Sequence, residues 1–137
     1  MEIYQREIHF YETDAMGVVH HSNYLRFFEE ARVDWIKKRG LSHCHYPQRD
    51  MTLAVIETQC HHYRPVFLGD QVSVKLQVRQ ERLKIHFRYA IFSSREVDRV
   101  AEGSSVHVPL NKELEVTRIP KELKHQLENE QWTETWP

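Results

Sequence analysis

The sequence predicts an α+β fold in which antiparallel strands pack against one long helix. An apolar stripe at helical spacing runs from residue 22 or 23 to about residue 38. The segments that follow have strand character, and two of them, 72–78 and 83–91, alternate strictly between apolar and polar residues. Runs of antiparallel strands beside a single helix are typical of the α+β class.

The first expected strand covers residues 2–11 and places Tyr4, Ile8 and Phe10 on one face. A connecting loop at 12–21 leads to the helix, which Ser22 or Asn23 is expected to cap. The helix carries a wide apolar stripe of Tyr24, Phe27, Phe28, Ala31, Trp35 and Ile36. Gly40 is expected to stop it.

The remaining strands follow from alternation and from the residues that interrupt it. A strand at 53–63 ends before Pro65, because proline cannot continue a central strand. The two alternating strands are joined by a tight turn at residues 80–82. A last strand is expected at 97–109, with Val100, Val106 and Val108 on one side. Pro120 fits the first turn of a short terminal helix, in which Leu123 and Leu127 are the apolar contacts.

Composition limits the possible functions. The 137 residues predict a single domain over 1–137, with a frayed tail at 129–137 unless Trp132 and Trp136 dock on another surface. The net charge of −1 argues against binding to nucleic acid. No apolar run is long enough for a membrane span, and the first residues lack the layout of a signal peptide, so we expect a cytoplasmic protein. The histidine pairs match no zinc spacing, and no metal site is expected.

The segment 11–24, YETDAMGVVHHSNY, contains the first candidate for chemistry. Asp14 precedes a turn at Gly17 and then the start of the helix, where unpaired backbone N–H groups and a partial positive charge are expected. A carboxylate that faces backbone donors can support acyl transfer. An aspartate before a glycine turn can also simply cap its own backbone.

Two segments carry a family resemblance. DAMGVVHHSNY at 14–24, followed by FFEEAR at 27–32, resembles the signature of the 4-hydroxybenzoyl-CoA thioesterase family, and within it the YbgC-like acyl-CoA thioesterases. YRPVFLGD at 63–70 is similar to a second segment of that family. The resemblance extends from residue 3 to about residue 123. It implies the hotdog fold, a curved antiparallel five-stranded sheet wrapped around a long central helix.

The resemblance also implies an activity, the hydrolysis of a small acyl-, fatty acyl- or aroyl-CoA to free acid and coenzyme A. Asp14 takes the place of the catalytic aspartate, as nucleophile or general base, and the backbone N–H of His21 takes that of the oxyanion donor. No cofactor is implied, because coenzyme A is part of the substrate. Homodimers or homotetramers with active sites at the dimer interface are expected. His20 and Ser22 depart from the family pattern, which leaves the acyl preference open.

Further residues are expected to bind the substrate. Gly17, Asn23 and Tyr24 belong to the matching segment, and Glu29 lies beside the apolar stripe of the helix. Basic side chains are needed for the phosphates of coenzyme A. The candidates are Arg64, Lys84 and Arg88, with Arg82 and Arg95 as alternatives, and Lys84 and Arg88 share a face of one strand.

Three other functions fit the sequence less well. A thioesterase that acts on acyl carrier protein needs the same aspartate. A non-catalytic module for acyl-CoA or acyl carrier protein would bind without turnover. A hotdog hydratase resembles a Gly-Asp-x-Asn-Pro-x-His pattern, but Gly69 and Asp70 are followed here by Gln71 without the later Asn, Pro or His.

Overall fold

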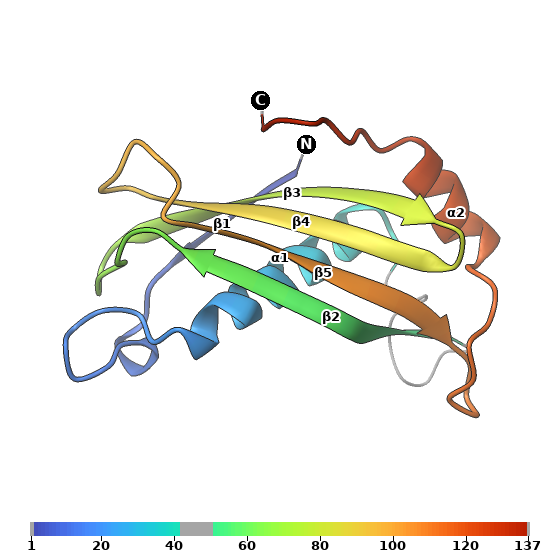
Figure 1. Ribbon diagram of the computed structural model, residues 1–137, viewed down its shortest axis with the longest axis horizontal. Helices are drawn as coiled ribbons and strands as arrows, with labels where there is room; N and C mark the ends of the chain where they lie inside the picture. Colours follow the sequence, from blue (N-terminus) through green and yellow to red (C-terminus); the bar gives the residue numbers. More distant parts are fainter. Residues whose placement is uncertain (1, 42–50, 137) are drawn as a thin grey trace.

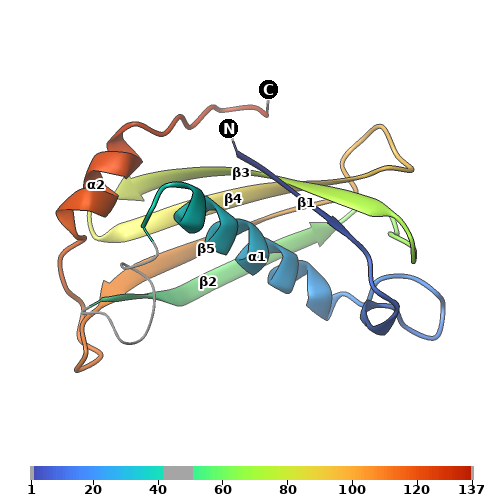
Figure 2. The ribbon, with the colours of Figure 1, turned by 180° about the vertical axis from the view of Figure 1, so that it is seen from behind.

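The computed structural model describes residues 2–41 and 51–136, whose strands form one antiparallel sheet with the order β1-β3-β4-β5-β2 (Figure 1). Helix α1 lies across one face of this sheet (Figure 2). The predicted α+β architecture is confirmed. The elements are β1 (Glu2–Glu7), α1 (Ser22–Lys38), β2 (Thr52–His62), β3 (Gln71–Glu81), β4 (Lys84–Ser93), β5 (Ala101–Leu110) and α2 (Lys121–Glu128).

The apolar stripe of α1 forms the centre of the core, as the sequence predicts. The ring of Phe28 stacks on Tyr89 of β4 with 4.2 Å between the centroids, and Trp35 meets Phe87 edge-on. Such aromatic pairs add to the free energy of folding beyond the area that they bury. All six predicted stripe residues are at most 4% exposed: Tyr24, Phe27, Phe28, Ala31, Trp35 and Ile36.

The prediction for α1 is confirmed at the C-terminal end and wrong at the N-terminal end. The helix ends at Lys38, and Gly40 follows with a φ of +68°, as expected for a glycine stop. The capping prediction was wrong, because the N-cap residue is His21, whose side chain makes no capping hydrogen bond. Ser22 already lies inside the first turn, where its Oγ is 2.9 Å from Nδ1 of His20.

Strand β1 is shorter than predicted. It ends at Glu7, and residues 10–12 form a single 3₁₀ turn. Ile8 is buried as expected, whereas Phe10 is 78% exposed and takes no part in the core. The alternation that was assumed to continue from Tyr4 to Phe10 therefore breaks where the chain turns toward the loop at 12–21.

Strand β5 presents small and polar side chains to α1, whereas its valines lie on the other side. The residues in register with the buried side of β4 are Ala101, Gly103, Ser105 and His107, whereas Val106 and Val108 lie on the opposite face. The Ser105 hydroxyl bonds to Nε2 of His107 at 2.8 Å and to Tyr89 at 2.6 Å. Small and polar side chains fit here because the stacked rings of Phe28 and Tyr89 already fill the space.

We expect Gly103→Ala to destabilise the fold by about 2–3 kcal/mol, since overpacking a core costs about this much. A Cβ at Gly103 would lie 2.3 Å from the backbone oxygen of Gln59 and 2.6 Å from the ring of Phe28. Denaturant unfolding measures the effect, with Ser104→Ala on the other face as the control. Equal stability of the two variants would contradict the close approach.

The C-terminal segment lies along the outer face of the sheet, opposite α1 (Figure 1). Trp132 packs on the guanidinium groups of Arg79 and Arg88, each 4.6 Å from its ring centroid. The Gln77 side chain donates to Thr133 at 3.0 Å. Residues 129–136 therefore differ from the frayed tail that we expected. Leu123 and Leu127 of α2 are buried, which confirms the predicted terminal helix.

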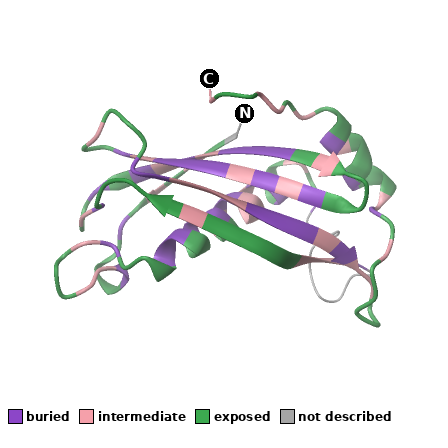
Figure 3. Ribbon diagram, in the orientation of Figure 1, coloured by how far each residue is buried: buried purple, intermediate pink, exposed green. Residues whose placement is uncertain are grey.

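Strand β2 is an edge of the sheet. Among the described residues its ladder partner is β5, and its other side is unpaired. Val55 and Ile56 are 50% and 52% exposed, and the ladder shifts register between Val55 and Glu57. Most of the strand is exposed (Figure 3). An unpaired edge of this length, with two exposed apolar side chains, is a ready surface for pairing with another strand. No described helix is long and apolar enough to cross a membrane.

Candidate active site

A buried ion pair anchors the loop between β1 and α1. Arg6 Nη2 lies 2.8 Å from Glu12 Oε2, and the side chains are 9% and 5% exposed. The other oxygen of Glu12 accepts from the backbone N–H of His9 at 2.8 Å. Asn23 donates from Nδ2 to the Glu12 carbonyl, also at 2.8 Å. The loop that carries Asp14 is thus fixed to both the sheet and the first turn of α1.

Asp14 closes its own turn with one carboxylate oxygen. Oδ1 accepts from the N–H of Met16 at 2.8 Å and from that of Val18 at 3.4 Å. Gly17 donates to the Asp14 carbonyl at 3.0 Å and has a φ of +81°, a conformation that other residues rarely adopt. Among the described residues no hydrogen bond reaches Oδ2. The capping role and a chemical role are therefore compatible, because each can use a different oxygen.

Asp14 faces a hollow of about 360 Å³ at the start of α1. The Tyr24 ring meets His62 edge-on with 4.6 Å between the centroids. Burial raises the pKa of Tyr24 to about 12, so its hydroxyl stays protonated at neutral pH. Burial, with His21 and His61 nearby, lowers the pKa of His62. The hollow is lined by Asp14, Val19, His21, Tyr24, His62, Tyr63, Arg64 and Pro65.

The backbone N–H of His21 donates to no described residue. The next amide, that of Ser22, donates to Nδ1 of His20 at 3.2 Å, and that of Asn23 donates to the His20 carbonyl at 3.0 Å. The side chain of His20 therefore occupies one of the donors that a helix start normally leaves open. The His21 donor at the positive end of α1 lines the same hollow as Asp14.

The structure does not bring all predicted site residues together. Glu29 lines another hollow, between α1 and β1, with Tyr4 and Arg26. Ala101, the first residue of β5, is in register with His62 on one side and with Ile91 of β4 on the other. Lys84 lies seven residues along β4 from Ile91. At about 3.3 Å per residue this is about 23 Å, so within one protomer Lys84 is remote from Asp14.

Two of the predicted basic residues have different surroundings. Arg64 lines the hollow of Asp14, and its ion pairs with Glu96 and Asp98 are long, at 3.7 and 3.6 Å. Arg88 donates from Nε to Gln77 at 2.9 Å, and its guanidinium lies 4.6 Å from the rings of Trp132 and Trp136. These contacts make Arg88 an anchor of the C-terminal segment. Lys84 and Arg88 do share one face of β4, as predicted.

Sequence reasoning missed His62 and Tyr63 as neighbours of Asp14. The available signal was the segment 63–70, which His62 precedes and Tyr63 begins, because that segment returns to the helix start: Val19 donates to the Val66 carbonyl at 2.8 Å. His61 and His62 line different hollows, because adjacent residues of a strand point to opposite faces of the sheet. Among the described residues no cluster of three His, Cys, Asp or Glu side chains could hold a metal ion; His43, Cys44 and His45 lie outside those residues.

Known proteins resemble this chain in sequence and in fold. A family model described as the thioesterase-like superfamily matches residues 8–127. A protein of Aquifex aeolicus named "Putative esterase" is 34% identical over 122 residues, which cover 88% of this chain and 93% of the relative. A 1,4-dihydroxy-2-naphthoyl-CoA hydrolase of Crocosphaera subtropica is 27% identical over 79% of this chain and 81% of its own length.

Two further likenesses concern the predicted branch and the fold. The acyl-CoA thioesterase YbgC of Helicobacter pylori is 28% identical over 76 residues, which cover 55% of this chain and 54% of that protein. The crystal structure of a hypothetical protein from Aquifex aeolicus superimposes with a TM-score of 0.85 at 32% identity, and covers 93% of this chain and 99% of that one. The resemblance deduced from residues 14–32 and 63–70 is confirmed, and so is the hotdog fold.

Proposed function

The chain belongs to the thioesterase-like superfamily, and we propose that it hydrolyses an acyl- or aroyl-coenzyme A at the hollow between Asp14 and the start of α1. The observation that carries this proposal is that Asp14 and His21 line one hollow, while among the described residues neither Oδ2 of Asp14 nor the backbone N–H of His21 has a hydrogen-bond partner. A carboxylate for the chemistry and a fixed donor for an oxyanion are what thioester hydrolysis requires.

In the general-base route, Asp14 takes a proton from water, and the hydroxide oxygen bonds to the thioester carbon. The carbonyl oxygen becomes an oxyanion that accepts a hydrogen bond from the His21 N–H. The C–S bond then breaks, and the thiolate of coenzyme A receives the proton held by Asp14. In the nucleophilic route, Oδ2 of Asp14 bonds to the carbon instead, the thiolate leaves, and water hydrolyses the resulting anhydride. Both routes give a carboxylic acid and a thiol.

The walls of the hollow favour a flat acyl group. Tyr24 and His62 place two rings against the site, and burial disfavours the charged form of each, because it raises the pKa of Tyr24 and lowers that of His62. Neutral aromatic walls suit an aroyl group because ring–ring contacts are favourable. The relative named 1,4-dihydroxy-2-naphthoyl-CoA hydrolase supports an aroyl substrate, and the YbgC relative supports an acyl one.

A panel assay tests the activity. We expect purified protein to release free thiol from at least one class among short-chain, long-chain and aromatic acyl-CoAs, with aromatic thioesters giving the highest kcat/KM. Absence of thiol release from every class would overturn the proposed activity. If thiol were released only from thioesters of acyl carrier protein, the proposed reaction would stand and the proposed substrate would change from acyl-CoA to acyl carrier protein.

We further propose that two protomers pair through β2 and form one continuous sheet. The exposed Ile56 and the unpaired edge support this arrangement. His62, which ends β2, lines the hollow of Asp14, so pairing along this strand would bring the partner next to the site. The hollow would then become more enclosed than it is in one protomer.

We expect Ile56→Asp to shift the protein from dimer to monomer, because a carboxylate at the strand edge would be desolvated on pairing. Light scattering after size-exclusion chromatography measures the mass. Leu114→Asp is the matched control, since Leu114 is 73% exposed and its φ of 63° suits aspartate. A dimer that survives Ile56→Asp would exclude pairing through β2.

A further inference from the structure

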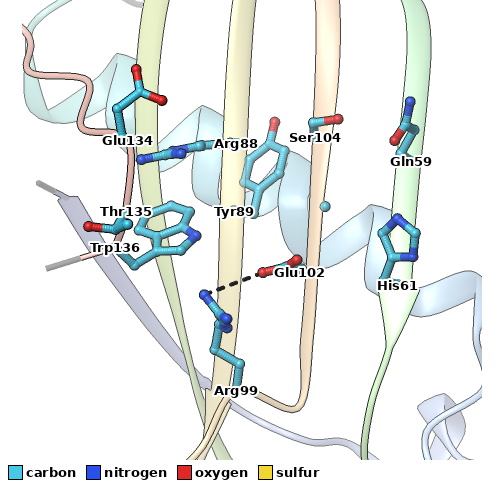
Figure 4. A pocket seen from close by; sticks show the side chains of 11 residues that line it. Gln59, His61, Arg88, Tyr89, Arg99, Glu102, Ser104, Glu134, Thr135 and Trp136 are labelled. Atoms are coloured by element: carbon cyan, nitrogen blue, oxygen red, sulfur yellow. Dashed lines mark ion pairs between the residues drawn. The ribbon is translucent and has the colours of Figure 1, made fainter.

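The outer face of the sheet carries a groove of about 660 Å³ that the proposed reaction does not use. In Figure 4, Trp136 and His61 lie on opposite sides of it, and the ion pair between Arg99 and Glu102 lies between them. Gln59 and Ser104 line the same groove. Its size falls in the range of small-molecule sites, which is roughly 300–1,000 Å³.

This groove is continuous with the hollow of Asp14. A third hollow, of about 530 Å³, lies between them. Tyr63 and Arg64 line both the hollow of Asp14 and this third one, and Arg99 and Trp136 line both the third one and the outer groove. The hydroxyl of Tyr63 donates to Glu102 at 2.8 Å, so a residue that lines the hollow of Asp14 contacts one that lines the outer groove. A long ligand could therefore extend from Asp14 to Trp136 along one surface track.

The middle of the track is basic. Arg64, Lys75 and Arg99 line it together with one carboxylate, that of Asp98. The ion pairs of the two arginines are long, at 3.4–3.7 Å, whereas the buried pair of Arg6 measures 2.8 Å. Charge-assisted hydrogen bonds to an anion are usually about 2.7–2.9 Å, so these guanidinium groups could bind a phosphate more closely than they bind their present partners.

Lys75 and Trp136 add a second type of contact. The Lys75 ammonium lies 4.7 Å from the Phe92 ring centroid, at the centre of the basic section. Trp136, where the basic section meets the outer groove, presents an indole that the Arg88 guanidinium supports from one side. This combination of groups matches a phosphorylated nucleoside. The cations suit the phosphate, the indole suits the base, and Gln59, Ser104 and Glu102 can form hydrogen bonds to the sugar.

We propose that this track binds the phosphorylated adenosine of coenzyme A, with its phosphates at Arg64, Lys75 and Arg99 and its adenine on Trp136. The inference rests on the proposed function, and it assigns the recognition of the nucleotide to residues other than Lys84 and Arg88. The pantetheine arm then crosses Tyr63 toward Asp14. Pairing through the edge of β2 would leave this outer face open.

The test is calorimetric titration of the full chain with coenzyme A and with adenosine 3′-phosphate 5′-diphosphate, which lacks the pantetheine arm. Lys75→Ala and Trp136→Ala should each weaken binding of both ligands at least tenfold, and Trp136→Phe should recover much of the loss because it keeps a platform. Lys124→Ala, an exposed lysine of α2, is the matched control and should bind as the unaltered protein does. Lys75→Ala does not alter the C-terminal segment, so it remains informative if Trp136→Ala fails to fold.

In assays of hydrolysis, the same two variants should raise KM for an aroyl-CoA about tenfold at constant kcat and should not affect the aroyl thioester of N-acetylcysteamine, which has no nucleotide. Unchanged affinity for coenzyme A in both variants would overturn the proposed track, and so would failure of the unaltered protein to bind it. Hydrolysis that continues in that case would leave the thioesterase proposal standing. Conversely, weakened binding in the variants without any hydrolysis by the unaltered protein would support the track and overturn the activity.

Discussion

Asp14→Asn should lower kcat for thioester hydrolysis by about 10²–10⁴-fold, the usual contribution of a positioned general base. The amide is isosteric and its oxygen can still accept from the Met16 and Val18 N–H groups that Oδ1 now binds. The turn should therefore survive while the negative charge is lost. Thiol release under substrate saturation measures kcat.

The fold and substrate binding need separate measurements in that variant. Thermal unfolding should give a Tm close to that of the unaltered protein, because the Arg6–Glu12 anchor is untouched. An intact aroyl-CoA should remain bound and be recovered unhydrolysed. A variant that keeps its fold and still turns over at the normal rate would show that Asp14 only caps its turn.

His21→Pro should reduce kcat by about 10²–10³-fold, as removal of one oxyanion donor does in known enzymes. Proline deletes the backbone N–H that donates to no described residue, so no structural hydrogen bond of the described chain is lost. The φ of His21 is −56°, which proline adopts readily, and proline is tolerated at a helix start.

The matched control is His21→Ala, which removes the imidazole and keeps the N–H. Its kcat should stay within a few-fold of the normal value, which separates the backbone from the side chain. If His21→Ala were as damaging as His21→Pro, the imidazole would be the catalytic group and the oxyanion role of the N–H would be wrong. Circular dichroism of both variants checks that α1 is retained.

Local patterns in the sequence were enough for most of the fold. The stripe of α1 and the alternation of β3 and β4 each report a buried face directly, because side-chain direction follows the period of the element. The pattern of β5 was less informative: Val106 and Val108 share one side of the strand as expected, but the other side packs against α1. The face toward α1 is decided by the rings of Phe28 and Tyr89, which leave room for Gly103 but not for a larger side chain.

The C-terminal segment shows a second limit. Fraying was expected because chain ends are often poorly ordered, with docking of Trp132 as the alternative. Trp132 does pack on Arg79 and Arg88, which come from neighbouring strands. Arg88 lies opposite Gln77 in the ladder, and Thr133 bonds to that glutamine. Such contacts depend on strand register, which no local pattern in the sequence contains.

The candidate site was only partly accessible from sequence. The motif singled out Asp14 and the start of α1, because these lie close together along the chain. His62 comes from a strand about forty positions later, and no local pattern links it to Tyr24. The sequence also did not show which backbone N–H at the helix start is occupied and which is open, because this depends on Nδ1 of His20 accepting from the Ser22 N–H.

The most direct test of the central claim is a crystal structure of Asp14→Asn with an unhydrolysed aroyl-CoA. The account predicts that the thioester oxygen lies about 2.7–3.1 Å from the backbone nitrogen of His21, the distance of an oxyanion donor. It also predicts that the side chain at position 14 faces the thioester carbon. A thioester bound elsewhere, for example in the hollow beside Glu29 between α1 and β1, would contradict the account.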